Sequence, residues 1–201
     1  MKKIIYLLIL CSAISAQSLD LREQKLTPKK GVMPKKQALV SDDIPATIIL
    51  DRRDSILKWK GGLKFAVSNH LGTLKIKQGR ILLMKDKNFT GGRIEINMAT
   101  MTNTDLSDPG KKERLIGHLR SKDFFDIEHF PTASLSIKSS KLIGKTNDGL
   151  YNVQITGDLT IKSTTKPITF NAIIDLDSKV KKATGTLTFN RTDFGVQYRA
   201  E

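Results

Sequence analysis

Residues 151–176 decide the fold, and they read YNVQITGDLTIKSTTKPITFNAIIDL. Apolar residues recur at every second position from Val153 to Ile161, with Gly157 as the exception, and again from Ile168 to Leu176. A period of two predicts two β-strands that each bury one face. The intervening Thr165-Lys166-Pro167 is typical of a turn, so we expect the two strands to pair antiparallel.

The same alternation recurs on both sides of this stretch. Asp148-Gly149 lies between two such runs and suits a hairpin turn, because Gly tolerates positive φ. A strand with one apolar face must be covered, and a barrel both covers it and removes exposed sheet edges. The further predicted strands lie around residues 57–59, 74–76, 81–83, 93–98, 133–138 and 186–190.

Residues 110–121 depart from this alternation. Leu115, Ile116 and Leu119 can share one face of a short helix despite Gly117. This helix would lie in a long crossover between strands. The predicted fold class is therefore all-β, an antiparallel barrel of about eight strands with a short helix in a long crossover.

The first sixteen residues, MKKIIYLLILCSAISA, have the layout of a secretory signal peptide. A basic start precedes a short apolar run, and small residues follow it. The run is too short to span a bilayer as a helix, which needs about 20 apolar residues. A buried N-terminal helix is the alternative. Cys11 raises a second alternative, lipoprotein anchoring, although Leu10 stands where a small residue is usual. The prediction is a periplasmic or secreted protein.

Residues 17–45 combine prolines, Gly31 and two lysine pairs with no aromatic residue and no sustained period. They are predicted to form a flexible basic linker, with a basic arm for a membrane surface as the alternative. The domain then spans residues 46–201. The 201 residues carry a formal charge of +14, which falls to +12 when Lys2 and Lys3 leave with the leader. An exported basic protein favours an anionic lipid or membrane surface over nucleic acid.

No reaction chemistry is indicated by the motifs. His70, His118 and His129 match no helical metal motif, and glycine loops of the GxSxG or phosphate-binding type are lacking. The sequence therefore predicts no catalytic residue, metal site or cofactor. A lipid-acting enzyme that uses His118 with Asp123 or Asp126 remains an alternative.

Several segments resemble the YceI-like family of polyisoprenoid-binding, lipocalin-like bacterial proteins. The resemblance runs from about Thr47 to the end of the chain, with the motifs in the same order. They are Trp59-Lys60-Gly61, His70-Leu71-Gly72, Gly91-Gly92, Thr104-Asp105-Leu106, residues 117–126 (GHLRSKDFFD), residues 130–134 (FPTAS), residues 157–162 (GDLTIK) and Arg191-Thr192-Asp193-Phe194-Gly195.

The resemblance implies a lipocalin-like barrel whose apolar channel holds a prenyl chain, with a polar mouth for the headgroup. The expected function is an exported carrier of a polyisoprenoid or other long-chain amphiphile, with an anionic headgroup fitting the basic charge. Family members usually continue with a further strand after the Arg191–Gly195 motif, so the barrel is expected either to lack its last strand or to close differently.

Ligand-binding residues are predicted from the alternation and from the motifs. Head-end candidates are His70, His118 and Arg191. A one-residue register error would exchange the two faces of a strand. The alternative function is a cavity-free envelope interaction module, for which these side chains fill a solid core. The inward candidates are Trp59, Ile76, Ile81, Ile94, Ile96, Met98, Leu135, Ile137, Ile155, Phe170 and Phe189.

Overall fold

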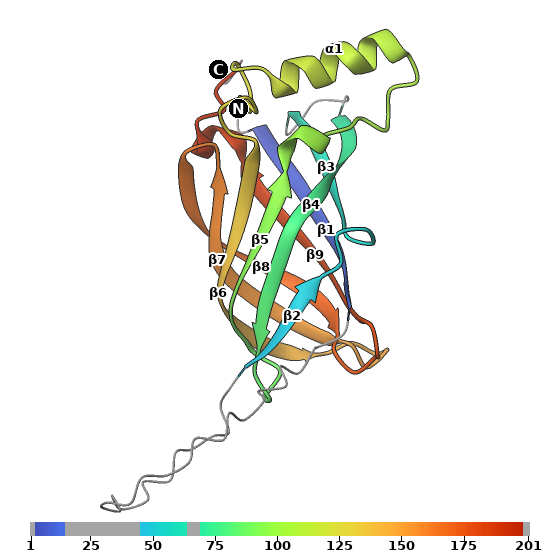
Figure 1. Ribbon diagram of the computed structural model, residues 1–201, viewed down its shortest axis with the longest axis vertical. Coiled ribbons are helices and arrows are strands. Elements are labelled where there is room, and N and C mark those ends of the chain that lie inside the picture. Colours follow the sequence, from blue (N-terminus) through green and yellow to red (C-terminus); the bar gives the residue numbers. More distant parts are fainter. Residues whose placement is uncertain (1–2, 15–44, 64–68, 199–201) are drawn as a thin grey trace, which may run out of the picture.

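The computed structural model describes residues 3–14, 45–63 and 69–198, and they form one nine-stranded antiparallel sheet that curls into a barrel (Figure 1). The predicted linker spans residues 17–45, of which 17–44 lie outside the described residues. Eight strands come from the predicted domain, which confirms the expected all-β barrel of about eight strands. They are β2 (Ala46–Leu50), β3 (Ile56–Leu63), β4 (Asn69–Leu83), β5 (Phe89–Asn97), β6 (Thr132–Lys145), β7 (Tyr151–Ile161), β8 (Thr164–Asp175) and β9 (Lys181–Asn190).

The ninth strand, β1 (Lys3–Ile14), comes from the segment that the sequence assigns to a leader. Its backbone pairs with β3 from Lys3↔Leu63 to Leu10↔Ile56, and with β9 from Ile4↔Asn190 to Ala13↔Lys181. A strand that is paired along both edges satisfies its backbone groups within the sheet, so this segment is not the buried helix of the alternative interpretation. The edge of β9, the last strand of the chain, is paired with β1.

The helix predicted at 110–121 is α1 (Pro109–Arg120), and it lies across one end of the barrel (Figure 1). Asp108 caps its start by accepting a hydrogen bond from the Lys111 N–H at 2.7 Å, and Pro109 occupies the first turn. Both residues are typical of helix N-termini. Two 3-10 turns, η1 (Met98–Thr100) and η2 (Arg191–Phe194), follow β5 and β9 at the same end.

Two of the turns predicted from the sequence can be compared with the structure. The hairpin at Asp148-Gly149 is confirmed, with Gly149 at φ 78°. The predicted turn at Thr165–Pro167 is wrong: β7 and β8 are joined at Lys162, which adopts φ 53°, and Pro167 lies inside β8 opposite Asp158. Proline is tolerated there because β8 pairs with β9 only from Ala172 to Asp175, which leaves Pro167 at an edge.

Candidate ligand-binding site

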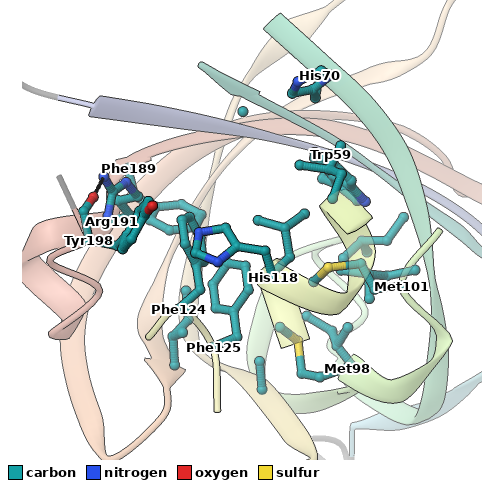
Figure 2. A pocket seen from close by; sticks show the side chains of 18 of the residues that line it. Trp59, His70, Met98, Met101, His118, Phe124, Phe125, Phe189, Arg191 and Tyr198 are labelled. Carbon is teal, nitrogen blue, oxygen red and sulfur yellow. Dashed lines mark hydrogen bonds between the residues drawn. The ribbon is translucent and has the colours of Figure 1, made fainter. Parts of the chain in front are cut away.

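The barrel interior contains a cavity of about 280 Å³ at the end covered by α1, which we call the upper cavity. Figure 2 shows aromatic rings and two methionines converging on it from several strands and from the crossover. Its volume lies near the small end of the usual range for ligand pockets, about 300–1,000 Å³. Its walls are almost entirely apolar, so it suits a hydrocarbon group. Its bulky apolar side chains are Trp59, Met98, Met101, Phe124, Phe125 and Phe189.

Trp59 is held in the cavity wall by the crossover. It is buried, and its indole N–H donates to the Thr102 carbonyl at 3.1 Å. Gly72 faces it on β4, and a Cβ at that position would lie 1.8 Å from the Thr102 oxygen and 2.5 Å from the indole. The absence of a side chain at Gly72 therefore lets the crossover and the indole meet.

Asp105 attaches the crossover to the rim of the barrel. Its carboxylate accepts hydrogen bonds from the Leu71 N–H at 2.6 Å and the Asn103 side-chain amide at 2.6 Å, and contacts His70 Nδ1 at 2.9 Å. Burial raises the pKa of Asp105, but these bonds outweigh it and leave the pKa below its ordinary value. His70, a predicted head-end residue, thus reaches the cavity wall while its ring is engaged by Asp105.

Replacing Asp105 with Asn is expected to destabilise the folded protein by about 1–3 kcal/mol at neutral pH, because hydrogen bonds to a charged group are lost. The folded pKa is lowered, so the stabilisation is present above the unfolded pKa and is lost as the pH falls through the folded one. Urea unfolding from about pH 6 to about pH 3 should show the difference between wild type and D105N shrinking. D123N alters an exposed carboxylate and should change stability by less than about 0.5 kcal/mol. A constant difference across that pH range would contradict this role.

His118 lies in the last turn of α1 and brings a polar atom to the upper cavity. Its ring packs edge-on against Tyr198, with centroids 4.3 Å apart, and against Phe124 at 5.8 Å (Figure 2). Its Nε2 atom is buried and has no hydrogen-bond partner. Such an atom costs free energy unless a hydrogen-bond partner satisfies it, so this position of the wall can take a polar group.

Arg191 is buried beside the same cavity. Its guanidinium N–H groups donate to the carbonyl oxygens of Val196 and Tyr198, and its charged centre lies 5.0 Å from the Phe124 ring centroid. Burial lowers the pKa of Arg191. The residue therefore anchors the segment that carries Tyr198 over the cavity, and two of its hydrogen-bond donors are already used there.

A lower cavity of about 60 Å³ lies further along the barrel axis. It receives Ile81, Ile94, Leu135, Ile137, Ile155 and Phe170 from the predicted set. The upper cavity receives Trp59, His70, Ile96, Met98, His118, Phe189 and Arg191. Ile76 is buried in the core and lines neither cavity. Ile94 and Ile96 are two residues apart on β5, so the cavities follow one another within about 7 Å along the strands.

Sequence reasoning missed several residues that complete the upper cavity. Met101 follows η1, where alternation has already ended. Phe124 and Phe125 belong to the 117–126 motif but to no alternating strand, and their rings lie 4.9 Å apart at the cavity wall. Tyr198 follows the last motif and carries no pattern of its own, so its position over His118 depends on tertiary packing alone.

The alternative function, a lipid-acting enzyme, would need His118 close to Asp123 or Asp126, and all three lie within the described residues. None of the contacts there joins His118 to a carboxylate, and Asp126 instead contacts His129 Nδ1 at 2.9 Å. That contact raises the pKa of His129. Within the same part of the chain, no group of three His, Cys, Asp or Glu side chains is placed to hold a metal ion. None of its helices has the length and hydropathy of a membrane span.

The chain is an antiparallel β-barrel with an apolar internal cavity and few polar groups, an arrangement that is consistent with a binding protein. The chain belongs to the YceI-like family: the YceI-like domain profile matches residues 49–201. A UPF0312 protein of Shewanella denitrificans is 31% identical over 150 residues, which cover 68% of this chain and 72% of that protein. A UPF0312 protein of Pseudomonas fluorescens is 31% identical over 109 residues, or 51% of this chain and 52% of that protein.

The match to the Pseudomonas fluorescens protein therefore spans about half of the length of that relative. Two solved structures are also similar. A mutant CJ YceI protein, crystallised with a monobromobimane guest, has a TM-score of 0.49 at 25% identity over 67% of this chain and 77% of that one. BcnA of Burkholderia cenocepacia has a TM-score of 0.40 at 13% identity over 92% of this chain and 96% of that one.

Proposed function

We propose that this protein is an exported carrier that holds a polyisoprenoid or another long-chain amphiphile in the upper cavity. The observation that carries the proposal is the cavity itself: about 280 Å³ of space lined by apolar side chains inside a barrel that could have been solid. Each methylene transferred from water to such a wall contributes about 0.8 kcal/mol before ordering costs. The interior is not the packed core that the interaction-module alternative requires.

The polar end of the ligand would lie near His118. Its partnerless Nε2 is a polar atom at the otherwise apolar wall, and the Arg191 guanidinium supplies positive charge nearby. A phosphate or diphosphate headgroup is favoured over a neutral one by this charge. A chain longer than the upper cavity would have to displace the side chains that separate it from the lower cavity.

Export is part of the proposal, and its support is the leader pattern of residues 1–16. Cleavage would remove β1, which would leave β3 and β9 with unpaired edges. The intact mass of the protein from its native host reports directly on this step, because loss of residues 1–16 changes it by a defined amount. A full-length mass in the cell envelope would contradict cleavage.

Native mass spectrometry of the protein from its own host, combined with lipid extraction, tests the carrier function. A co-purifying long-chain lipid is expected, and a protein that carries none would count heavily against the proposal.

Ala133→Leu tests the cavity without adding a charge. Ala133 is buried on β6 and lines the upper cavity, so leucine there fills space with three more carbon atoms. We expect affinity for geranylgeranyl diphosphate to fall at least about tenfold, with stability changed by no more than about 1–3 kcal/mol. Trp59, the sole tryptophan of the chain, lies in the wall and reports binding by fluorescence. Unchanged affinity in a folded A133L protein would place the ligand elsewhere. A parallel titration with geranylgeraniol, which lacks the diphosphate, measures how much the headgroup contributes to the affinity.

A further inference from the structure

Three turns meet at the end of the barrel opposite α1 (Figure 1). Lys87, in the β4–β5 turn, contacts Asp177 of the β8–β9 turn at 2.8 Å. The Tyr151 hydroxyl, at the start of β7, donates to the same carboxylate at 3.0 Å. Lys145, at the end of β6, lies 4.6 Å above the Tyr151 ring. These contacts join the turns into one surface, which we call the turn end.

Aliphatic side chains are exposed on the turn end, and each stands among lysines. Residues 141–145 read KLIGK, and residues 179–182 read KVKK. Ile143 is 50% exposed, Val180 42% and Leu142 38%. Single exposed aliphatic residues are ordinary on protein surfaces, whereas these three lie in two segments that are both flanked by lysines and both belong to the same end of the barrel.

The turn end carries a net positive charge, because its lysines outnumber its carboxylates. The lysines are Lys85, Lys87, Lys141, Lys145, Lys179, Lys181 and Lys182, and the carboxylates are Asp86, Asp148, Asp175 and Asp177. Asp177 is engaged by Lys87 and Tyr151, and Asp175 by Ser178 at 2.5 Å. These hydrogen bonds lower the pKa of both carboxyl groups. No ion pair within the described ranges joins Lys141, Lys179 or Lys182 to a carboxylate, and all three are exposed.

We propose that the turn end is a docking surface for a bilayer that contains anionic phospholipids. Lysines near such a surface each contribute about 1 kcal/mol of attraction, and the aliphatic side chains between them enter the interfacial layer. A protein partner fits less well, because protein interfaces are depleted in lysine and are anchored by Trp, Tyr and Arg. Docking would leave the α1 end, with the upper cavity, directed away from the bilayer. The inference does not depend on the ligand proposal.

Co-sedimentation of the full chain with vesicles tests this surface. We expect binding to phosphatidylcholine vesicles that contain phosphatidylglycerol, weaker binding at high salt, and little binding to phosphatidylcholine alone. The double variant Lys179→Gln/Lys182→Gln should weaken the partition coefficient about tenfold or more. Ile143→Ser/Val180→Ser should weaken it by a similar factor without a change of charge. Circular dichroism verifies that each variant is folded.

Matched variants on the barrel wall separate a docking site from diffuse attraction. Lys58→Gln/Lys75→Gln removes the same charge from exposed positions of β3 and β4, and Ile49→Ser/Ile56→Ser removes equally exposed aliphatic side chains. We expect these variants to bind within about twofold of wild type. Equal weakening by the wall variants, or no binding to the anionic vesicles, would overturn the proposal.

Discussion

Gly72→Ala is expected to destabilise the folded protein by about 3 kcal/mol or more. The new Cβ would lie 1.8 Å from the Thr102 carbonyl oxygen and 2.5 Å from the Trp59 indole. A backbone oxygen cannot rotate away as a side chain can, so the crossover must shift and the indole must lose its hydrogen bond to Thr102. Overpacking of this kind typically costs about 1–3 kcal/mol and sometimes more, in proteins whose total stability is about 5–15 kcal/mol.

Urea unfolding followed by Trp59 fluorescence measures this effect at the site of the change. The control is Gly117→Ala, because a Cβ at Gly117 meets nothing within 4 Å. Gly117 lies inside α1, where alanine should stabilise the protein by about 0.5–1 kcal/mol. The same substitution thus has opposite expected signs at the two positions. A neutral G72A protein would mean that the crossover does not pack against β4 as closely as described.

Met98→Arg is expected to abolish uptake of geranylgeraniol. Met98 is 5% exposed and lines the upper cavity, and none of the described residues that line it is Asp or Glu. A guanidinium there either fills the space or draws water into it, and both outcomes remove the apolar environment that binds a hydrocarbon chain. Affinity should fall more than about a hundredfold, or about 2.8 kcal/mol, which corresponds to the loss of about three or four buried methylenes. Trp59 fluorescence titration gives the measurement.

Ile49→Arg serves as the control for Met98→Arg. Ile49 is 56% exposed on the outside of β2, so the same charge at that position should leave uptake unchanged. A buried arginine also lowers stability, and thermal unfolding must show that M98R remains folded at the assay temperature. If M98R does not fold, the neutral variant A133L decides the location of the ligand. Wild-type uptake by a folded M98R protein would show that this face does not bind the chain.

Much of the barrel could be predicted from local sequence patterns. Alternation with period two identifies β5, β7, β8 and β9, because side chains of a strand point to opposite faces whatever the strand packs against. Asp108 and Pro109 mark the start of α1 for an equally local reason, since they satisfy and pre-form the first turn of a helix. The motifs also indicated the YceI-like family before any packing was known.

The local pattern was wrong at one turn. Pro167 is typical of a turn, yet it lies in β8 because Lys162 makes the turn five residues earlier. Residues 4–10 form an uncharged apolar run that suits a leader and a strand equally, and in the structure they pair with β3 and β9. Neither outcome is encoded in the segment itself, because both depend on which neighbour supplies hydrogen bonds.

By itself the sequence determined the class of fold, the helix in the crossover and which residues of each strand lie inside. Tertiary structure decided whether that inside is solid or hollow, because alternation reports the buried face but not how closely opposite walls approach. It also decided the site: Asp105 reaches His70 across 35 residues, and Tyr198 covers His118 from the end of the chain. The physical reason is that the alternation of side chains between the two faces of a strand is a local property of the backbone. Cavity volume and hydrogen-bond partners depend instead on distances between segments that are far apart in the sequence.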